Sequence, residues 1–120
     1  MRGFVITYKP KDAYSRVMIN HMLFGRIVGR YYRGRKSIYY LKGMLHNTRF
    51  ARLVGSKIFV ESIKPINFEK LKEFGELTHN ACLRDISTLK FVTGQEYWKQ
   101  FAAEKGLFLK ISPKQRKVIP

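Results

Sequence analysis

The sequence predicts an α+β fold: a small single domain with a mostly antiparallel sheet of about four to six strands and two to three helices. Two observations carry this prediction. Short runs of β-branched and aromatic residues alternate with helix-start signals, and a glycine-containing turn joins two of these runs. The length of 120 residues, 45% of them hydrophobic, suits one core. We expect one basic domain over residues 1–112 and a basic C-terminal tail over 113–120.

A strand and a helix are expected first. Residues 3–8 are rich in β-branched and aromatic side chains and end before a Lys-Pro pair, which is typical of a strand. Asp12 can accept hydrogen bonds from the first free amides of a helix over 13–24. Gly25 stands where a left-handed C-terminal cap would end that helix.

A hairpin is expected next. Two β-rich runs, residues 26–32 and 37–45, flank an Arg-Gly-Arg-Lys segment in which Gly34 can take the positive φ of a turn. Large aromatic side chains occur at consecutive positions in both runs, so they fall on both faces of the pair. We therefore expect one face of the hairpin to stay aromatic and exposed.

The middle of the chain predicts an irregular or short helical connection over residues 46–55 and a strand over 57–62. Asn67 is a suitable cap for a second helix. Continued helical spacing extends that helix towards Cys82, which we expect to be a buried packing residue. The apolar stripe of the helix consists of Phe68, Leu71 and Phe74.

The last third begins with a short strand over residues 87–92. Thr93 and Glu96 have the spacing of a capping box, in which each side chain can bond the backbone of the other residue. This third helix should end at Gly106, and residues 107–111 form the last expected strand. Two aromatic residues of its apolar stripe, expected in the core, are Trp98 and Phe101.

The charge of the chain is strongly unbalanced and points to an anionic partner. Lys and Arg number 24 against 8 Asp and Glu, which gives a net charge of +16. Residues 13–60 contain ten cations, seven of them arginine, and no carboxylate. Arginine presents a planar fork that pairs with phosphate, and uncompensated positive charge opposes compaction unless a polyanion neutralises it. Nucleic acid is therefore the expected partner.

Other partner classes and locations are less compatible with the sequence. No run of about 20 apolar residues can form a spanning helix, and the first residues do not resemble a signal peptide. The cations lie in predicted strands and turns, so a membrane surface is not an expected partner. One cysteine cannot form an internal disulfide. We expect a cytoplasmic protein.

The hairpin carries the strongest functional signal, because its cations interleave with tyrosines. Cations neutralise phosphates, and aromatic rings stack on unpaired bases with about 1 to 3 kcal/mol per base. This mixture favours RNA over DNA, and the size and charge suit a structural ribonucleoprotein component, as in the ribosome. The alternative is that the tyrosines are ordinary cross-strand pairs of a half-buried sheet.

Arg49 and Arg52 would share a helical face, on which they could clamp one phosphate. The full set of predicted nucleic-acid-binding residues is Arg16, Arg26, Arg30, Tyr31, Tyr32, Arg33, Arg35, Lys36, Tyr39, Tyr40, Lys42, His46, Arg49, Arg52 and Lys57.

Catalytic signals are weak. The three histidines, His21, His46 and His79, are far apart in sequence, and no known catalytic, phosphate-loop or metal-binding motif occurs. We therefore expect no cofactor or metal and, on balance, no enzyme. The alternatives are a DNA-binding protein, a small metal-independent nuclease with His46 as general base, or a basic subunit of a nucleic-acid-processing complex. The carboxylates that could dock a protein partner are Glu61, Glu69, Glu73 and Glu76.

Overall fold

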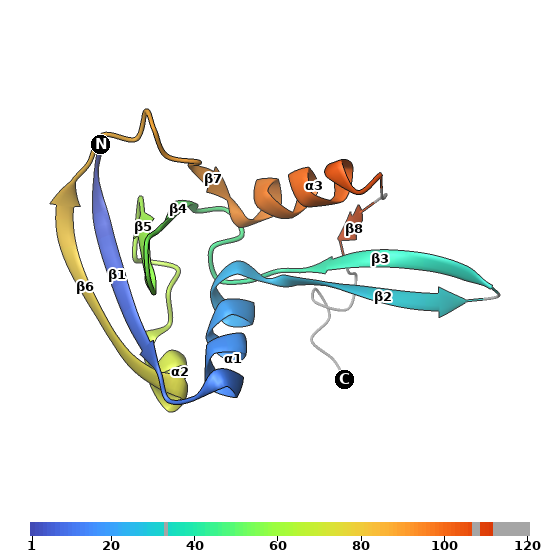
Figure 1. Ribbon diagram of the computed structural model, residues 1–120, viewed down its shortest axis with the longest axis horizontal. Coiled ribbons are helices and arrows are strands. Elements are labelled where there is room, and N and C mark those ends of the chain that lie inside the picture. Colours follow the sequence, from blue (N-terminus) through green and yellow to red (C-terminus); the bar gives the residue numbers. More distant parts are fainter. Residues whose placement is uncertain (33, 107–108, 112–120) are drawn as a thin grey trace.

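The computed structural model contains a five-stranded antiparallel sheet, a smaller sheet and three α-helices (Figure 1). The structure describes residues 1–32, 34–106 and 109–111, without the side chains of residues 30–32, 35–37 and 109–111. The α+β fold with a largely antiparallel sheet is confirmed. The basic tail expected over 113–120 lies outside the described residues.

The larger sheet has the strand order β6-β1-β5-β4-β7, and every pair of neighbours is antiparallel. Its central strand β1 places Ile6 opposite Ile58 on one side and opposite His79 on the other. The strands are β1 (Arg2–Pro10), β4 (Arg49–Leu53), β5 (Lys57–Val60), β6 (Gly75–Leu83) and β7 (Val92–Thr93).

The main core lies between the inner face of this sheet and the first two helices, α1 (Ala13–Phe24) and α2 (Phe68–Leu71). Side chains alternate between the faces of a strand, and the inward positions of β1 and β5 are apolar and buried. Members of this core are Ile6, Tyr8, Ile19, Leu23, Phe24, Leu45, Phe50, Ile58, Val60, Ile66 and Leu71.

The outer face of the sheet has a small apolar cluster of its own around Phe59. This side chain points away from the main core, yet it is 0% exposed. Phe91 covers it, with the two ring centroids 5.9 Å apart. A Cβ at Gly3 would lie only 2.7 Å from the Phe59 ring, so the neighbouring strand needs glycine there. This cluster buries a large aromatic side chain without a covering helix.

Helix α1 has the predicted bounds and both predicted caps. The Asp12 carboxylate accepts a hydrogen bond from the backbone N–H of Ser15 (2.7 Å), which lowers the pKa of the Asp12 carboxyl. Gly25 follows the helix with φ of +77°, a left-handed conformation that glycine adopts without strain. Local sequence signals therefore set both ends of this helix.

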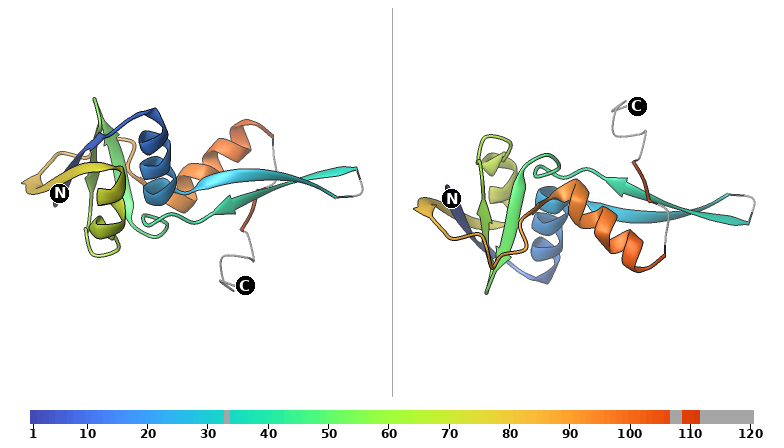
Figure 2. Two further views of the ribbon diagram at one scale, coloured as in Figure 1. Left: turned by 90° about the horizontal axis from the view of Figure 1, so that it is seen from below. Right: turned by 90° about the horizontal axis from the view of Figure 1, so that it is seen from above.

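The smaller sheet forms a two-stranded arm, residues 26–41, that projects from the body (Figure 1). It consists of β2 (Arg26–Tyr32) and β3 (Arg35–Leu41) in antiparallel register, and β8 (Leu109–Ile111) pairs with β3 in parallel. The predicted hairpin is confirmed, but its second strand covers residues 35–41 and not the predicted 37–45. Figure 2 shows the two strands twisting around each other as they leave the body, whose longest dimension with the arm is 49 Å.

The irregular or helical connection predicted over residues 46–55 is wrong, because residues 49–53 form strand β4. Phe50 and Ala51 are both buried, on opposite faces of the sheet, and they pair with Val60 and Phe59 of β5. The period-2 pattern is hidden when both faces of a strand are covered. Pairing with a neighbour decided the structure of this segment.

The long second helix is also wrong. Helix α2 has four residues and passes through a 3₁₀ turn (Lys72–Phe74) into β6. At Gly75 a Cβ would clash with the carbonyl oxygen of Lys9, and from there nine residues pair with β1. Pairing with the central strand overrides the helical spacing. Cys82 consequently lies partly exposed on a strand and is not a buried helix residue.

The capping box and the third helix, α3 (Gly94–Glu104), are confirmed. Of the strand predicted over residues 87–92, only Val92 is in a strand, which continues into Thr93. Trp98 and Phe101 are half-buried, so they are less enclosed than predicted. Of the last predicted strand, residues 107–108 lie outside the described part of the chain, and the strand begins at Leu109.

Candidate nucleic-acid interface

The arm is rooted in the C-terminal end of α1. The last four carbonyls of a helix lack partners within it, and buried carbonyls need hydrogen bonds. Gly25 donates to the His21 carbonyl (2.9 Å) as an ordinary cap. The remaining three carbonyls accept hydrogen bonds from other elements: Met22 from Met44 N (2.7 Å), Leu23 from Leu45 N (2.9 Å) and Phe24 from Trp98 Nε1 (2.8 Å).

Helix α3 joins the same root. The backbone N–H of Gly94 donates to the Leu45 carbonyl (2.9 Å), and that of Gln95 donates to the His46 carbonyl (3.3 Å). The start of α3 is therefore fixed to the segment that caps α1, and α3 lies along the proximal half of the arm (Figures 1 and 2). These hydrogen bonds tie the arm to both helices.

Tyr40, a predicted nucleic-acid contact, fills the centre of the arm root. Its side chain is 1% exposed, so no ring face is open to a base. Its hydroxyl lies 3.0 Å from His46 Nδ1, and the two rings stack. Burial raises the pKa of Tyr40 to about 12, against a hydrogen bond with the Gly43 backbone that lowers it. The burial of Tyr40 favours the alternative in which this tyrosine packs the sheet, and its contact with nucleic acid stays a prediction.

His46 is half-buried beside Tyr40. Burial lowers the pKa of its imidazole first, and the positive charges of Lys42 and Lys99 lower it further. The Tyr40 hydroxyl and His46 Nδ1 share one hydrogen bond, in which either atom can donate according to the tautomer of the imidazole. The lowered pKa makes this imidazole a weaker base than a free one, and its contacts with Tyr40 place it in the packing of the arm root.

The arm, together with Lys42 directly after it, carries six of the ten predicted Lys and Arg contacts. Between Arg26 and Lys42 the sequence has six Lys and Arg and no carboxylate. Backbone register places residues 30–32 opposite residues 35–37 in the distal half of the arm. Arg33 lies outside the described residues, and the side chains of five further predicted contacts are not described: Arg30, Tyr31, Tyr32, Arg35 and Lys36. Tyr39 is half-buried on β3.

At the foot of the arm, three basic side chains surround a shallow hollow of about 300 Å³. They are His21, Arg26 and Lys42, and the remaining lining residues are Met18, Met22 and Leu41. Burial, and then the charge of Arg26, lower the pKa of His21. Sequence reasoning predicted Arg26 and Lys42 as contacts but did not join His21 to them. The only available signal was its position one turn before the hairpin.

The shared helical face predicted for Arg49 and Arg52 is wrong. Both lie on strand β4, where residues three apart point to opposite faces. Arg49 forms an ion pair with Glu61 (Nε to Oε2, 3.2 Å) and covers the Phe91 ring. Arg52 lies over the Phe24 ring, 4.3 Å from its centroid. These two arginines cannot clamp one phosphate.

A second, smaller hollow of about 130 Å³ lies beside Arg52. Its lining combines aromatic residues with the exposed cation Lys90, which the sequence analysis did not single out. Phe50 is buried beneath it and Tyr97 is half-buried at its edge. Lys90 could not be found from sequence because it enters this hollow from a loop far from β4 along the chain.

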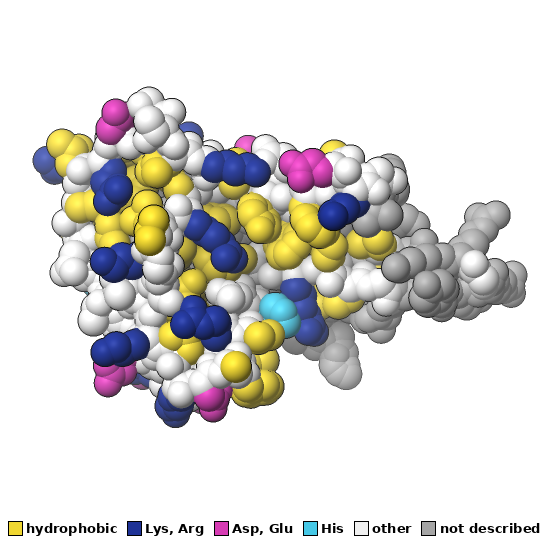
Figure 3. Space-filling view, viewed as in Figure 1, with side chains coloured by type: hydrophobic (Ala, Val, Ile, Leu, Met, Phe, Trp, Pro, Cys, Tyr) yellow, Lys and Arg dark blue, Asp and Glu magenta, His cyan; other side chains and the backbone are white. Residues whose placement is uncertain are grey.

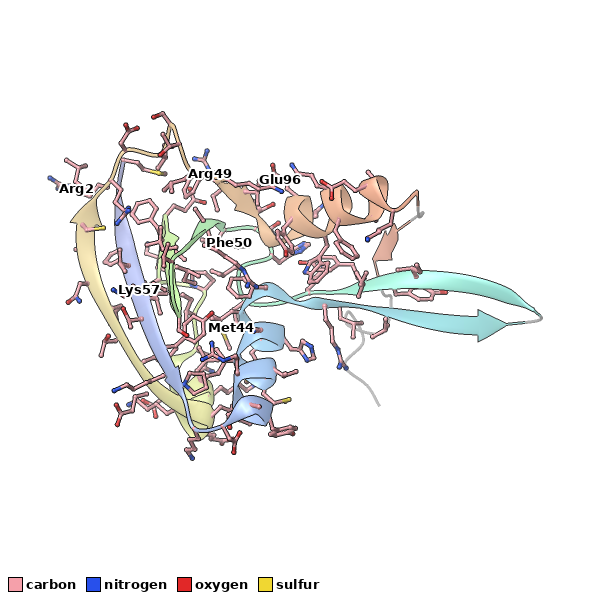
Figure 4. All side chains as sticks on the ribbon, in the orientation of Figure 1. Arg2, Met44, Arg49, Phe50, Lys57 and Glu96 are labelled. Carbon is pink, nitrogen blue, oxygen red and sulfur yellow. The ribbon has the colours of Figure 1, made fainter. Side chains whose placement is uncertain are left out.

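The other predicted contacts lie away from the arm. Arg16 on α1 donates a hydrogen bond to Ser56 Oγ (2.8 Å). Lys57 is exposed on β5, and Figure 4 shows Lys57 and Arg49 on the sheet, far from the arm. The predicted residues therefore divide into a group on the arm and its foot and a scattered group on the body.

Carboxylates cannot balance the positive charge. All eight occur in the described part of the chain, where two ion pairs are formed, Arg49–Glu61 and Lys72–Glu69. If each of the eight carboxylates neutralised one of the 24 cations, 16 would still be uncompensated. Figure 3 shows Lys and Arg spread over the face seen there, with Asp and Glu near its upper and lower edges.

No match to this chain is found among known protein families, curated proteins or solved structures, so function has to be inferred from its own residues. Among residues 1–32, 34–106 and 109–111, no three His, Cys, Asp or Glu side chains gather closely enough to hold a metal ion. No helix in the same part of the chain is long and apolar enough to cross a bilayer.

Proposed function

We propose that this protein binds nucleic acid through the arm and its foot, with RNA favoured over DNA. One observation carries the proposal: a two-stranded arm projects from the body, and the stretch from Arg26 to Lys42 that forms it has six cations and no carboxylate. A projecting element reaches into a groove or loop of a partner. Its uncompensated guanidinium groups attract phosphates and release the counterions bound to them.

RNA is favoured by the combination of arginine with tyrosine. RNA loops present unstacked bases, which stack on aromatic rings and guanidinium planes. Since Tyr40 is buried, the tyrosines proposed for this role are Tyr31 and Tyr32 of the distal arm. A protein that binds RNA in this way without cleaving it would suit the role of a structural ribonucleoprotein component.

Duplex DNA is the second candidate, and the form of the arm favours it. The major groove of B-DNA admits a two-stranded β-ribbon, whereas the major groove of A-form RNA is deep and narrow. A DNA-binding arm would use its cations on phosphates on either side of the groove. Comparison of single-stranded RNA, an RNA hairpin and duplex DNA of matched length separates these partners.

The test measures binding of these three labelled probes by fluorescence anisotropy at a series of salt concentrations. For single-stranded RNA we expect affinity to fall steeply with salt, in keeping with about four to six phosphate contacts. Replacing Arg30, Arg33 and Arg35 together by glutamine should reduce the log-log slope by about 2, since each single-strand contact contributes about 0.7.

A matched control removes the same charge from the body. The exposed residues Lys11, Lys64 and Lys70 lie outside the arm, and their replacement by glutamine should change the slope much less. If the slope of log affinity against log salt concentration is the same in the two triple variants, the arm is not part of the interface. Absence of binding to all three probes at low salt would reject nucleic acid as the partner.

The nuclease alternative is tested with the same RNA. We expect it to stay intact during incubation with the protein, with or without a chelator, because His46 is a weak base engaged with Tyr40. Cleavage that persists in chelator and disappears in a folded His46→Ala variant would support the enzyme instead.

A further inference from the structure

The hollow at the foot of the arm is formed by three segments that the fold brings together. The last turns of α1 contribute Met18, His21 and Met22, the first residue of β2 contributes Arg26, and the end of β3 contributes Leu41 with Lys42 after it. Its volume of about 300 Å³ is at the lower end of the range of small-ligand sites.

Nitrogen donors form one part of the lining. Arg26 and Lys42 are exposed at the rim, and His21 is partly buried beside them. A guanidinium group can hold two oxygens of one phosphate, and an ammonium group adds a point charge. The described residues that line the hollow include no carboxylate, so an incoming anion meets no charge of its own sign among them.

Apolar side chains form the remaining part. Met18, Met22 and Leu41 are partly buried and offer a surface of thioether and aliphatic groups. Methionine is flexible and polarisable, and it makes favourable contacts with aromatic rings. Donors for a phosphate next to a floor for a flat ring match the two chemical halves of a nucleotide.

We propose that this hollow binds one unpaired nucleotide of a single-stranded RNA, its phosphate on Arg26, Lys42 and His21 and its base on Met18, Met22 and Leu41. This inference rests on the proposed function and assigns it a specific subsite. The RNA strand that contains this nucleotide would continue from the hollow along the cations of the arm, since Arg26 is the first residue of the arm.

Binding should take up a proton at His21. The charged groups that face this imidazole are Arg26 from β2 and Lys42 from the segment after β3. Burial and Arg26 keep its pKa below the usual 6.5, so the ring is mostly neutral at pH 7 in the free protein. A bound phosphate favours the charged ring and raises this pKa. Affinity therefore increases as the pH falls from 8 towards 6.

The experiment uses the full chain and a fluorescein-labelled ten-nucleotide oligouridylate, with a fully paired RNA duplex as the second probe. Arg26→Gln should weaken oligouridylate binding about tenfold by removing a charge-assisted contact. The matched control Lys64→Gln removes one exposed charge elsewhere and should weaken it less than about twofold, as expected for screened long-range attraction.

The pH dependence of binding is compared between the variants His21→Gln and His79→Gln. His79 lies on β6 and stacks on Phe68, outside the hollow. Wild type and His79→Gln should bind about threefold more tightly at pH 6 than at pH 8, and His21→Gln should lose this gain. Thermal melting of each variant confirms that it is folded.

A measurement on the wild type keeps the proposal testable if a variant fails to fold. Uridine 5′-monophosphate is titrated against the protein, and the imidazole proton signals are followed by NMR at several pH values. Addition of the nucleotide should move the His21 signal and raise the pKa of this imidazole. The position of the His79 signal at each pH should stay the same when the nucleotide is added.

The outcomes separate the subsite from the general function. If wild type binds oligouridylate but Arg26→Gln and His21→Gln behave like their controls, the subsite is rejected and nucleic-acid binding stands. If Arg26→Gln and His21→Gln lose as much affinity for the duplex as for oligouridylate, the hollow does not recognise an unpaired base. If wild type binds neither probe, both proposals fail.

Discussion

Tyr40 joins the arm to the body through contacts on several sides. Its hydroxyl pairs with His46, and its ring packs so closely on Gly25 that a Cβ there would lie 2.9 Å from it. Tyr40→Phe keeps the ring and removes the hydrogen bond, so we expect a loss of about 1 kcal/mol in the free energy of unfolding at pH 8. Urea denaturation measures it, and Tyr14→Phe, on an exposed ring, is the control.

Alkaline pH should remove this difference in the free energy of unfolding. The pKa of Tyr40 is about 12 in the folded protein and about 10 in the unfolded chain, so folding favours the neutral phenol. This contribution to stability is complete below pH 10 and is lost as the pH rises from 10 to about 12. The gap between wild type and Tyr40→Phe should therefore close by about pH 11. A gap that is constant from pH 8 to 11 would contradict the buried phenol.

Gly25 and Gly55 provide a matched pair for separating steric clash from backbone strain. Both have a positive φ, +77° and +81°. A Cβ at Gly25 would clash with the Leu41 carbonyl oxygen and approach Gly43 N to 2.9 Å, whereas nothing lies within 4 Å of one at Gly55. We expect Gly55→Ala to cost about 1 kcal/mol from φ alone and Gly25→Ala about 3 kcal/mol or more. Similar costs in urea denaturation would show that the arm root is loosely packed.

At the scale of elements, those with local end signals were predicted well. Asp12 and Gly25 delimit α1, and Thr93 with Glu96 begins α3. Strands β4 and β6 were missed because long-range pairing forms them. Phe50 and Ala51 on β4 are buried on opposite faces, which removes the alternation, and the helix-like spacing before β6 ends at Gly75, where the chain comes close to Lys9 of β1.

The capping box of α3 offers a direct test of a local signal. Thr93 Oγ1 accepts from Glu96 N (3.1 Å), and Glu96 Oε1 accepts from Thr93 N (3.4 Å). Thr93→Ala should lower the free energy of unfolding by about 1 kcal/mol, and Thr93→Ser, which keeps the hydroxyl, should recover most of it. If serine and alanine destabilise equally, the methyl group of Thr93 and not the cap is what matters.

At the scale of the whole molecule, the sequence predicted the interface only in part. The six cations from Arg26 to Lys42 could be identified because they are contiguous and lack carboxylates. The hollow at the foot of the arm could not, since His21 comes to Arg26 and Lys42 only through the end of α1 and the pairing of β2 with β3. The wrong placement of Arg49 with Arg52 followed directly from the missed strand β4.

The uncompensated charge should limit the stability of the free protein. Sixteen excess positive charges repel one another within a molecule 49 Å long, and the Debye length falls from about 30 Å at 0.01 M salt to about 8 Å at 0.15 M. Added NaCl should therefore raise the thermal midpoint by several degrees over this range. The Lys11, Lys64 and Lys70 to glutamine variant carries less charge and should start from a higher midpoint with a smaller salt response. A midpoint that stays level or falls with salt in the wild type would mean that repulsion among these charges does not limit stability, and this argument for an anionic partner would fail.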